Sequence, residues 1–207
     1  MKNYKTAGIY PAIAFGIALT LSGNTAGAQQ LTKAQRVGAG IYEIVVEQES
    51  GAVYVASVGQ RDKLGPHIYK LDPQTLTVKD SISLGDIAGF GLGINQQTKV
   101  LYTTNTRSNS VHAVDLKTGK VLATISNGAK SSHTREVAVD EINNLVYISD
   151  VGDPSTVWVI DGKTNQYLYS LENAGKTATG LAVYPEKNLL YVTVMGSRSE
   201  ERRVGKE

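Results

Sequence analysis

Four tyrosine-containing segments recur along the chain at a nearly constant spacing, and this repeat restricts the fold more than any other feature. The tyrosines Tyr54, Tyr102, Tyr147 and Tyr191 are 48, 45 and 44 residues apart, and each lies in an alternating apolar run. Ten and eight residues before each tyrosine stands an apolar pair, and the spacing of two places both side chains on one strand face. The pairs are Ile44/Val46, Leu92/Ile94, Val137/Val139 and Leu181/Val183. The residue inside each pair is Val45, Gly93, Ala138 or Ala182, and such small side chains suit an inner strand crowded against its counterparts around an axis.

A third apolar strand follows each complete tyrosine strand and ends at an aspartate, after which a turn and a fourth strand are expected. The aspartates are Asp72, Asp115 and Asp161. Their carboxylates can accept hydrogen bonds from turn amides, while Gly119 and Asn165 can adopt the left-handed conformation of a tight hairpin. We therefore interpret these aspartates as turn formers rather than catalysts.

Four antiparallel strands in each unit of about 45 residues are typical of a β-propeller blade. A two-sheet sandwich is the alternative, but it does not require one strand order and one turn chemistry to recur in phase. The composition agrees with an all-β chain, because 21 glycines weaken helices and 11 tyrosines favour strands. The absence of cysteine excludes disulfides, thiolate metal ligands and a cysteine nucleophile.

Several segments resemble the YVTN-type β-propeller repeat. The similar segments are Tyr191-Val192-Thr193-Val194, the stretch from Val114 to Val121, and the runs 135–140, 146–149, 157–162 and 175–182. The resemblance covers about Leu31 to Thr193 and is greatest to a periplasmic member of the family, to which single-stranded DNA binding is attributed. It implies a seven-bladed propeller, whereas this chain holds three blades and the first two strands of a fourth. We therefore expect an incomplete ring with blades near 40–84, 88–126, 133–171 and 177–196.

Both ends of the chain differ in composition from the repeats. Lys2 and Lys5 precede an apolar run, and Ala26-Gly27-Ala28 supplies the small residues that a signal peptidase requires, so residues 1–28 are expected to be a cleaved secretory signal. A membrane anchor is the weaker alternative, because polar residues and Pro11 interrupt a run that is short for a bilayer span. These features predict a periplasmic or secreted protein with no membrane span after cleavage.

Residues 197–207 form a charged tail that follows a strand-like run without turn residues. We interpret it as non-native sequence, and a solvated natural tail is the alternative. Without the signal and the tail the net charge is −1, so net charge alone predicts no strong attraction to polyanions.

The sequence contains no motif for catalysis, metal binding or cofactor binding. His67, His112 and His133 occupy different positions in the repeat and show no metal-ligand spacing. Gly89 to Gly93 is glycine-rich but lacks the lysine of a phosphate-binding loop. The sequence therefore predicts no catalytic residue, no metal and no cofactor.

The candidate site follows from propeller geometry, in which loops gather at the mouth of the central channel. The positions twelve residues before each tyrosine are Tyr42, Phe90, Arg135 and Thr179, and the same face is expected to receive Arg61, Lys63, Asn105, Arg107, Lys130, His133, Asp150, Asp153 and Lys176. Aromatic faces bind bases and cations bind the backbone in proteins that take single strands. The candidate nucleic-acid-binding residues are Tyr42, Phe90, Arg107, Arg135 and Lys176, although packing of the loops is an equally good explanation for them.

Three function classes remain open at this stage. The first is a non-enzymatic binding propeller, with single-stranded DNA as its candidate ligand. The second is an envelope scaffold that binds a protein partner. The third is an enzyme, because propellers of the YVTN type include lyases and subunits of redox enzymes, but no base, nucleophile or ligand cluster recurs at the mouth.

Overall fold

The computed structural model describes residues 32–60 and 65–196, together with the backbone of 202–205. Residues from Lys33 onward form one compact unit. The expected signal sequence at 1–28 lies outside the described residues. Among the described residues, regular helix is limited to the 3-10 turn Pro185–Lys187. The all-β fold class predicted from the repeat is therefore confirmed.

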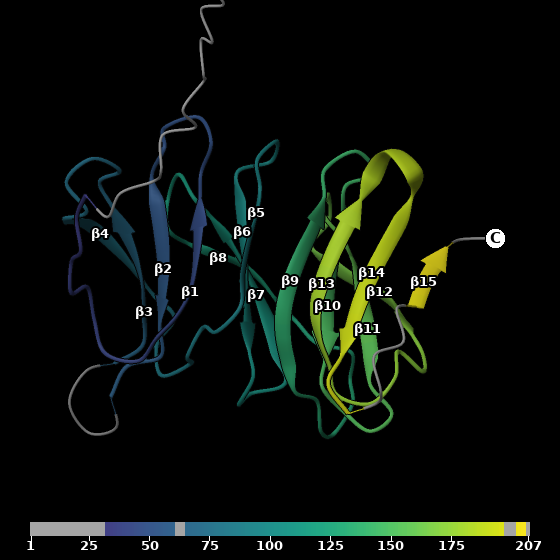
Figure 1. Ribbon diagram of the computed structural model, residues 1–207. Coiled ribbons are helices and arrows are strands. Elements are labelled where there is room, and N and C mark those ends of the chain that lie inside the picture. Colours follow the sequence, from purple (N-terminus) through teal and green to yellow (C-terminus); the bar gives the residue numbers. More distant parts are fainter. Residues whose placement is uncertain (1–31, 61–64, 197–201, 206–207) are drawn as a thin grey trace, which may run out of the picture. The chain divides into compact units, whose positions relative to one another are not determined.

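The strands form four antiparallel sheets, each of them consecutive in the sequence (Figure 1). The first sheet contains β1 (Ile41–Val46), β2 (Val53–Ser57), β3 (His67–Leu71) and β4 (Val78–Ser83). The second contains β5 (Leu92–Asn95), β6 (Val100–Asn105), β7 (Ser110–Asp115) and β8 (Val121–Ile125). The third contains β9 (Thr134–Asp140), β10 (Leu145–Asp150), β11 (Thr156–Asp161) and β12 (Gln166–Leu171). The fourth contains β13 (Ala178–Tyr184), β14 (Leu189–Val194) and β15 (Arg202–Gly205).

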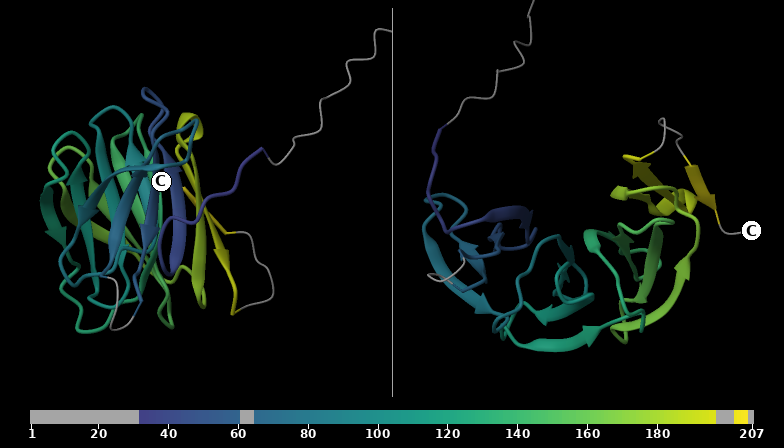
Figure 2. Two further views of the ribbon diagram at one scale, coloured as in Figure 1. Left: turned by 90° about the vertical axis from the view of Figure 1, so that its left-hand side faces the viewer. Right: turned by 90° about the horizontal axis from the view of Figure 1, so that it is seen from below.

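Each sheet is a simple meander in which the strands pair in sequence order, as expected for a propeller blade. Within the unit that starts at Lys33, successive sheets follow one another around an open arc, with β1, β5, β9 and β13 on its inner side (Figure 2). The incomplete ring of propeller blades predicted from the sequence is confirmed.

The fourth sheet contains one strand more than the sequence predicted. The expectation was two strands, over 177–196, followed by a tail. The backbone of β15 pairs antiparallel with β14, with Leu189 opposite Gly205 and Val192 opposite Arg202. This segment therefore occupies the place that β3, β7 and β11 hold in the other sheets.

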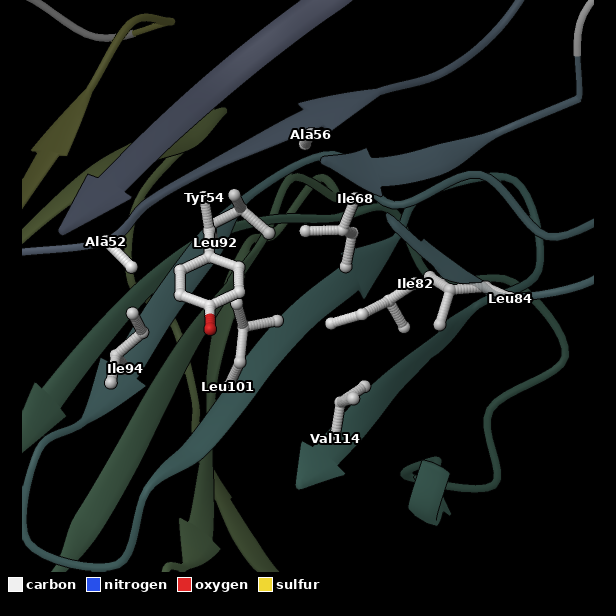
Figure 3. Close-up of a cluster of buried hydrophobic side chains, with 10 residues drawn as sticks. All are labelled: Ala52, Tyr54, Ala56, Ile68, Ile82, Leu84, Leu92, Ile94, Leu101 and Val114. Carbon is white, nitrogen blue, oxygen red and sulfur yellow. The ribbon is translucent and has the colours of Figure 1, made fainter. Parts of the chain in front are cut away.

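Three layers of the hydrophobic core lie between neighbouring blades, and a smaller fourth cluster, of Val53, Val55 and Leu71, lies on the first sheet under Val37. In the first layer Tyr54 of β2 packs against Leu92 and Ile94 of β5 (Figure 3). In the same way, Tyr102 packs against the apolar pair of the third blade and Tyr147 against the apolar pair of the fourth. The repeat tyrosine thus contacts the following blade, and the apolar pair contacts the preceding one.

The glycine inside the second apolar pair is explained by close packing of neighbouring inner strands. A Cβ atom on Gly93 would lie 2.5 Å from the Val137 Cγ1 atom of β9. The sequence-based expectation of an inner strand crowded against its counterpart is confirmed at this position.

The three aspartates form turns, as predicted. Asp72 Oδ1 accepts hydrogen bonds from the amides of Gln74 and Thr75, and Asp115 Oδ1 accepts one from Thr118. Asp161 Oδ1 accepts bonds from the amides of Lys163 and Thr164. The Thr75 amide and hydroxyl lower the pKa of Asp72 to about 2, which agrees with an ionised carboxylate that accepts hydrogen bonds within the turn.

Candidate functional site

An irregularity in strand pairing recurs where each inner strand begins. Ile41 pairs with Ser57 but Ile44 pairs with Val55, so Tyr42 and Glu43 together oppose a single residue of β2. The same shift occurs between β9 and β10 and between β13 and β14. In the second blade the Phe90 amide donates to Thr104 O, and the Thr104 amide donates to Gly91 O. A β-bulge changes the direction in which side chains leave a strand. The first residues of the four bulged pairs are the predicted mouth positions Tyr42, Phe90, Arg135 and Thr179.

The residue opposite three of the four bulges carries a hydroxyl group, and two of these hydroxyls link neighbouring blades. The Thr104 hydroxyl accepts from the Gly91 amide at 2.8 Å and donates to the Arg135 carbonyl of the third blade at 2.8 Å. Ser149 makes the equivalent bridge from the Glu136 amide to the carbonyl of Thr179. These bridges fix the backbone of Arg135 and Thr179, two of the predicted mouth positions.

In the fourth blade the equivalent hydroxyl, that of Thr193, makes no bond to another blade within the described residues. Thr193 accepts from the Gly180 amide at 3.0 Å and reaches the carbonyl of the same residue only at 3.4 Å. The first blade has Ala56 at this position and forms no such bridge.

Four of the five predicted binding residues form one cluster drawn from three blades. The rings of Tyr42 and Phe90 meet edge to face with their centroids 5.1 Å apart. The guanidinium of Arg107 lies 5.6 Å from the Phe90 centroid, and that of Arg135 lies 6.0 Å from the Tyr42 centroid. We call these four residues the mouth cluster. The two rings lie at the centre of the cluster, and one arginine flanks each ring at a distance suited to cation–π attraction.

The arginines of the mouth cluster carry charge that no carboxylate neutralises through a direct ion pair. Within residues 32–60 and 65–196, the ion pairs involve only Lys79, Lys99 and Lys176 as cations. Arg107 and Tyr42 are exposed, whereas Arg135 and Phe90 are half-buried. The cluster therefore offers two positive charges and two ring surfaces to solvent.

The remaining predicted residues lie elsewhere or are occupied by other contacts. Lys176, the fifth candidate, pairs with Asp153 at 3.1 Å and makes no ring contact with the mouth cluster. Arg61 and Lys63 lie outside the described residues. Asn105 and Asp150 were expected on the mouth face but are buried. Asp150 accepts bonds from the His133 amide and from the indole of Trp158, so its role is structural.

Two carboxyl groups stand beside the mouth cluster, each on the second residue of a bulged pair. Glu43 Oε2 accepts a bond from the Leu92 amide at 3.2 Å, and Glu136 follows Arg135 directly. Burial and then repulsion by Glu136 raise the pKa of Glu43 to about 7, against the lowering effect of the Leu92 amide. Burial also raises the pKa of Glu136, while Arg135 opposes the change. Near neutral pH the charge beneath the cluster therefore depends on pH.

We expect Glu43→Gln to remove a pH-dependent loss of stability. Folding raises the pKa of Glu43 from 4.5 to about 7. The carboxyl group therefore does not lower the free energy of unfolding below pH 4.5, but lowers it progressively as the pH rises from 4.5 to about 7. The melting temperature of the variant should therefore exceed that of the wild type at pH 8, and the two should converge at pH 4. Thermal melts across this range measure the difference. Glu186→Gln, in the 3-10 turn, controls for loss of a surface carboxylate. A wild type that gains stability relative to Glu43→Gln as the pH rises would contradict the expectation.

In the described part of the chain no group of three or more His, Asp or Glu side chains could hold a metal ion. Of the histidines, His112 is buried in β7, and burial lowers its pKa, which favours the neutral ring. No described helix is long and apolar enough to cross a membrane.

The meander blades, the inter-blade tyrosines and the bulged inner strands define a β-propeller segment. No protein-family model matches the chain. Curated proteins named YncE are similar to the chain in sequence. The chain is 35% identical over 179 residues to the uncharacterized protein YncE of Escherichia coli K12 and 37% identical over 166 residues to that of Salmonella typhi. These matches cover 82% and 76% of this chain, and the chain spans about half the length of each relative, 50% and 46% respectively.

A solved structure shows the same fold at low sequence identity. The hydrazine synthase of Kuenenia stuttgartiensis superposes with a TM-score of 0.66 at 17% identity, over 86% of this chain and 53% of that one. At this identity the likeness concerns the fold alone.

Proposed function

We propose that the chain belongs to a non-enzymatic, exported propeller whose mouth cluster binds single-stranded nucleic acid, with single-stranded DNA as the ligand. The observation that carries the proposal is a pair of adjacent aromatic rings flanked by two arginines, neither arginine being in an ion pair with a described carboxylate. Sequence-independent binding of single strands uses these two groups together.

The two rings and the two arginines of the mouth cluster have separate roles in this proposal. Tyr42 is exposed and Phe90 half-buried, so each ring offers a face on which a base can stack. Arg107 and Arg135 lie beside those rings and can move from them to the phosphates on either side of a stacked base. The net charge of −1 over residues 29–197 makes this a local attraction rather than a property of the whole surface.

Loss of a ring and loss of an arginine should affect binding in two different ways. Phe90→Ala should weaken binding of a fluorescent single-stranded oligonucleotide by about 1–3 kcal/mol with little change in salt dependence. Arg107→Ala should instead lower the slope of log K against log salt by about 0.7, the increment for one phosphate contact on a single strand. Titrations at several salt concentrations distinguish the two effects.

The controls separate binding from folding. Lys163→Ala removes an exposed cation in the turn after β11 and should leave both affinity and slope close to those of the wild type. Each variant requires an unchanged melting temperature, because Phe90 also holds Tyr42. If the wild type does not bind at low salt, or if a folded Tyr42/Phe90/Arg107 triple alanine variant binds equally well, the nucleic-acid proposal fails and a protein-binding scaffold becomes the better explanation.

Export is the part of the proposal that rests on residues 1–28. The two lysines, the apolar run and Ala26-Gly27-Ala28 support cleavage after Ala28 and residence in the periplasm. The N-terminal sequence of the protein recovered from the cell envelope should begin at Gln29, and an intact Met1 there would contradict it.

A further inference from the structure

In each of the first three blades an aromatic ring and a polar side chain lie on the same sheet face. The polar residue stands three places after the repeat tyrosine, and the ring lies on the third strand, opposite the residue that directly follows the tyrosine. Side chains one and three places after the tyrosine point to one face of the strand. The pairs are Ser57/Tyr69, Asn105/His112 and Asp150/Trp158.

Protein groups bond to the polar residue in the first and third blades. The Ser57 hydroxyl donates to Ala39 O at 2.6 Å. Asp150 Oδ2 accepts from the Trp158 indole at 3.0 Å, and Asp150 Oδ1 accepts from the His133 amide at 2.7 Å. The polar residue is buried in both of these blades and has partners there, as is usual in protein interiors.

The second blade buries three polar atoms that have no hydrogen-bond partner within the described residues: Thr103 Oγ1, Asn105 Oδ1 and His112 Nδ1. Thr103 and His112 face each other across β6 and β7, and Asn105 is the next residue on the same face of β6. Thr103 and Asn105 are inaccessible to solvent, and His112 is 4% exposed. Asn105 Nδ2 does have a partner, since it donates to the Ser110 hydroxyl at 3.2 Å. Burial of unpaired polar atoms is unfavourable, so a further molecule that bonds to these three atoms stabilises the blade.

Two residues distinguish the second blade from its neighbours at this place. The imidazole of His112 lacks the fused six-membered ring of the Trp158 indole, and its Nδ1 atom makes no bond to the polar residue of its own blade. Thr103 supplies a hydroxyl group where the first and third blades have Val55 and Ile148. A smaller ring and an additional polar atom therefore occur together, and this combination accommodates a small polar molecule.

We propose that Thr103, Asn105 and His112 bind one buried water molecule in the interface between the first and second blades. The same face of the second blade carries Leu101 and Val114, which pack in the core layer shared with the first blade. Three hydrogen bonds are typical of a buried water. The water donates to Asn105 Oδ1 and to His112 Nδ1 and accepts from the Thr103 hydroxyl, so that each donor has an acceptor.

An ion is a less suitable occupant than water, because the three groups are neutral. Burial lowers the pKa of His112, which keeps its ring uncharged. A cation or an anion bound by these groups would be buried without an opposite charge from them, at a high cost in free energy.

The site adjoins the segment that leads into the mouth cluster. A Cβ atom on Gly89, the residue before Phe90, would lie 2.5 Å from Thr103 Oγ1, so this segment passes close to the hydroxyl group. The bound water therefore supports the backbone beside Phe90. The proposal itself concerns the blade interface and does not depend on nucleic-acid binding.

Oxygen-17 magnetic relaxation dispersion tests the proposal, because it counts only the water molecules that a protein holds for long times. The double variant Thr103→Ile/His112→Trp gives the second blade the residues of the third, so the introduced indole can donate to Asn105 as Trp158 donates to Asp150. The wild type should contain one long-lived water more than this variant. Thr124→Val, at an exposed residue of β8 opposite His112, is the control and should leave the count unchanged. Equal counts in the wild type and the folded double variant overturn the proposal.

Thermal stability provides a second measurement that does not require the double variant to fold. Thr103→Val keeps the shape of the side chain and removes only the hydroxyl group. If that group bonds to a water, its loss should lower the melting temperature by about 2–4 °C, the shift for one hydrogen bond in a chain of this size. Removal of an unpartnered hydroxyl from the interior has the opposite effect and raises the melting temperature. An unchanged or higher melting temperature for Thr103→Val, relative to the Thr124→Val control, therefore overturns the proposal.

Discussion

Tyr102→Ala is expected to reduce the free energy of unfolding by about 3–5 kcal/mol, the range for removal of a large buried side chain. Tyr102 is fully buried between the second and third blades, and its hydroxyl donates to Asn165 Oδ1 at 2.6 Å. The same substitution at Tyr191 should cost less than about 1 kcal/mol, because that ring is only half-buried. Urea denaturation measures both.

The comparison of these two tyrosines tests the blade interface, since residue type and place in the repeat are the same. Tyr102→Phe provides a finer control, because it keeps the ring and loses only the bonds of the hydroxyl, to Asn165 Oδ1 and at 3.4 Å to the Gly162 carbonyl, at a cost of about 1 kcal/mol. Equal costs for alanine at Tyr102 and Tyr191 would show that the repeat tyrosine is stabilised inside its own sheet rather than by the next blade.

Trp158→Ala should also cost about 3–5 kcal/mol, for packing and for a hydrogen bond. The indole is fully buried in the layer between the second and third blades and meets Tyr167 edge to face at 6.0 Å. Its Nε1 atom donates to Asp150 Oδ2 at 3.0 Å, and Asp150 Oδ1 accepts from the His133 amide at 2.7 Å. The substitution therefore leaves a cavity and also weakens the link to the segment that leads into β9.

Trp158→Phe separates these two contributions. It keeps most of the ring packing but leaves Asp150 with one donor fewer, so the expected cost is about 1–3 kcal/mol. Because Trp158 is the single tryptophan, unfolding is followed by circular dichroism rather than by fluorescence. A loss as large for phenylalanine as for alanine would assign the stability to the hydrogen bond and not to the packing.

The sequence predicted the blades because their determinants are local and repeated. The tyrosine spacing and the apolar pairs correspond to observed strands and to the faces that form the core. The pairing of β15 with β14 was not predicted, because seven of the ten residues from Arg198 are charged and the segment shows no strand alternation.

The candidate site could be predicted only in part. Counting back from the tyrosines identified Tyr42, Phe90 and Arg135, which do lie together, and Arg107 joins them. Asn105 and Asp150, which were also expected on the mouth face, are buried, and counting along the sequence does not detect buried side-chain hydrogen bonds such as that between Asp150 and Trp158.

The hydroxyl bridges were missed, although the sequence contains a signal for them. Thr104, Ser149 and Thr193 each stand two residues after a repeat tyrosine. Their role depends on the bulge in the paired strand. A bulge interrupts the two-residue alternation of side chains from which strands are predicted. Glu43 was overlooked for the same reason, since it is the second residue of a bulged pair.

The repeated use of one interface also bears on how a chain of this kind can change in length over evolution. A blade meets its predecessor through an apolar pair and its successor through a tyrosine, so an in-frame duplication of about 45 codons inserts a unit that satisfies both neighbours at once. A duplication or deletion of half a unit leaves a tyrosine or an apolar pair without its counterpart. Selection for solubility therefore favours gains and losses of whole repeats, and recombination within a strand is disfavoured even where the reading frame is preserved.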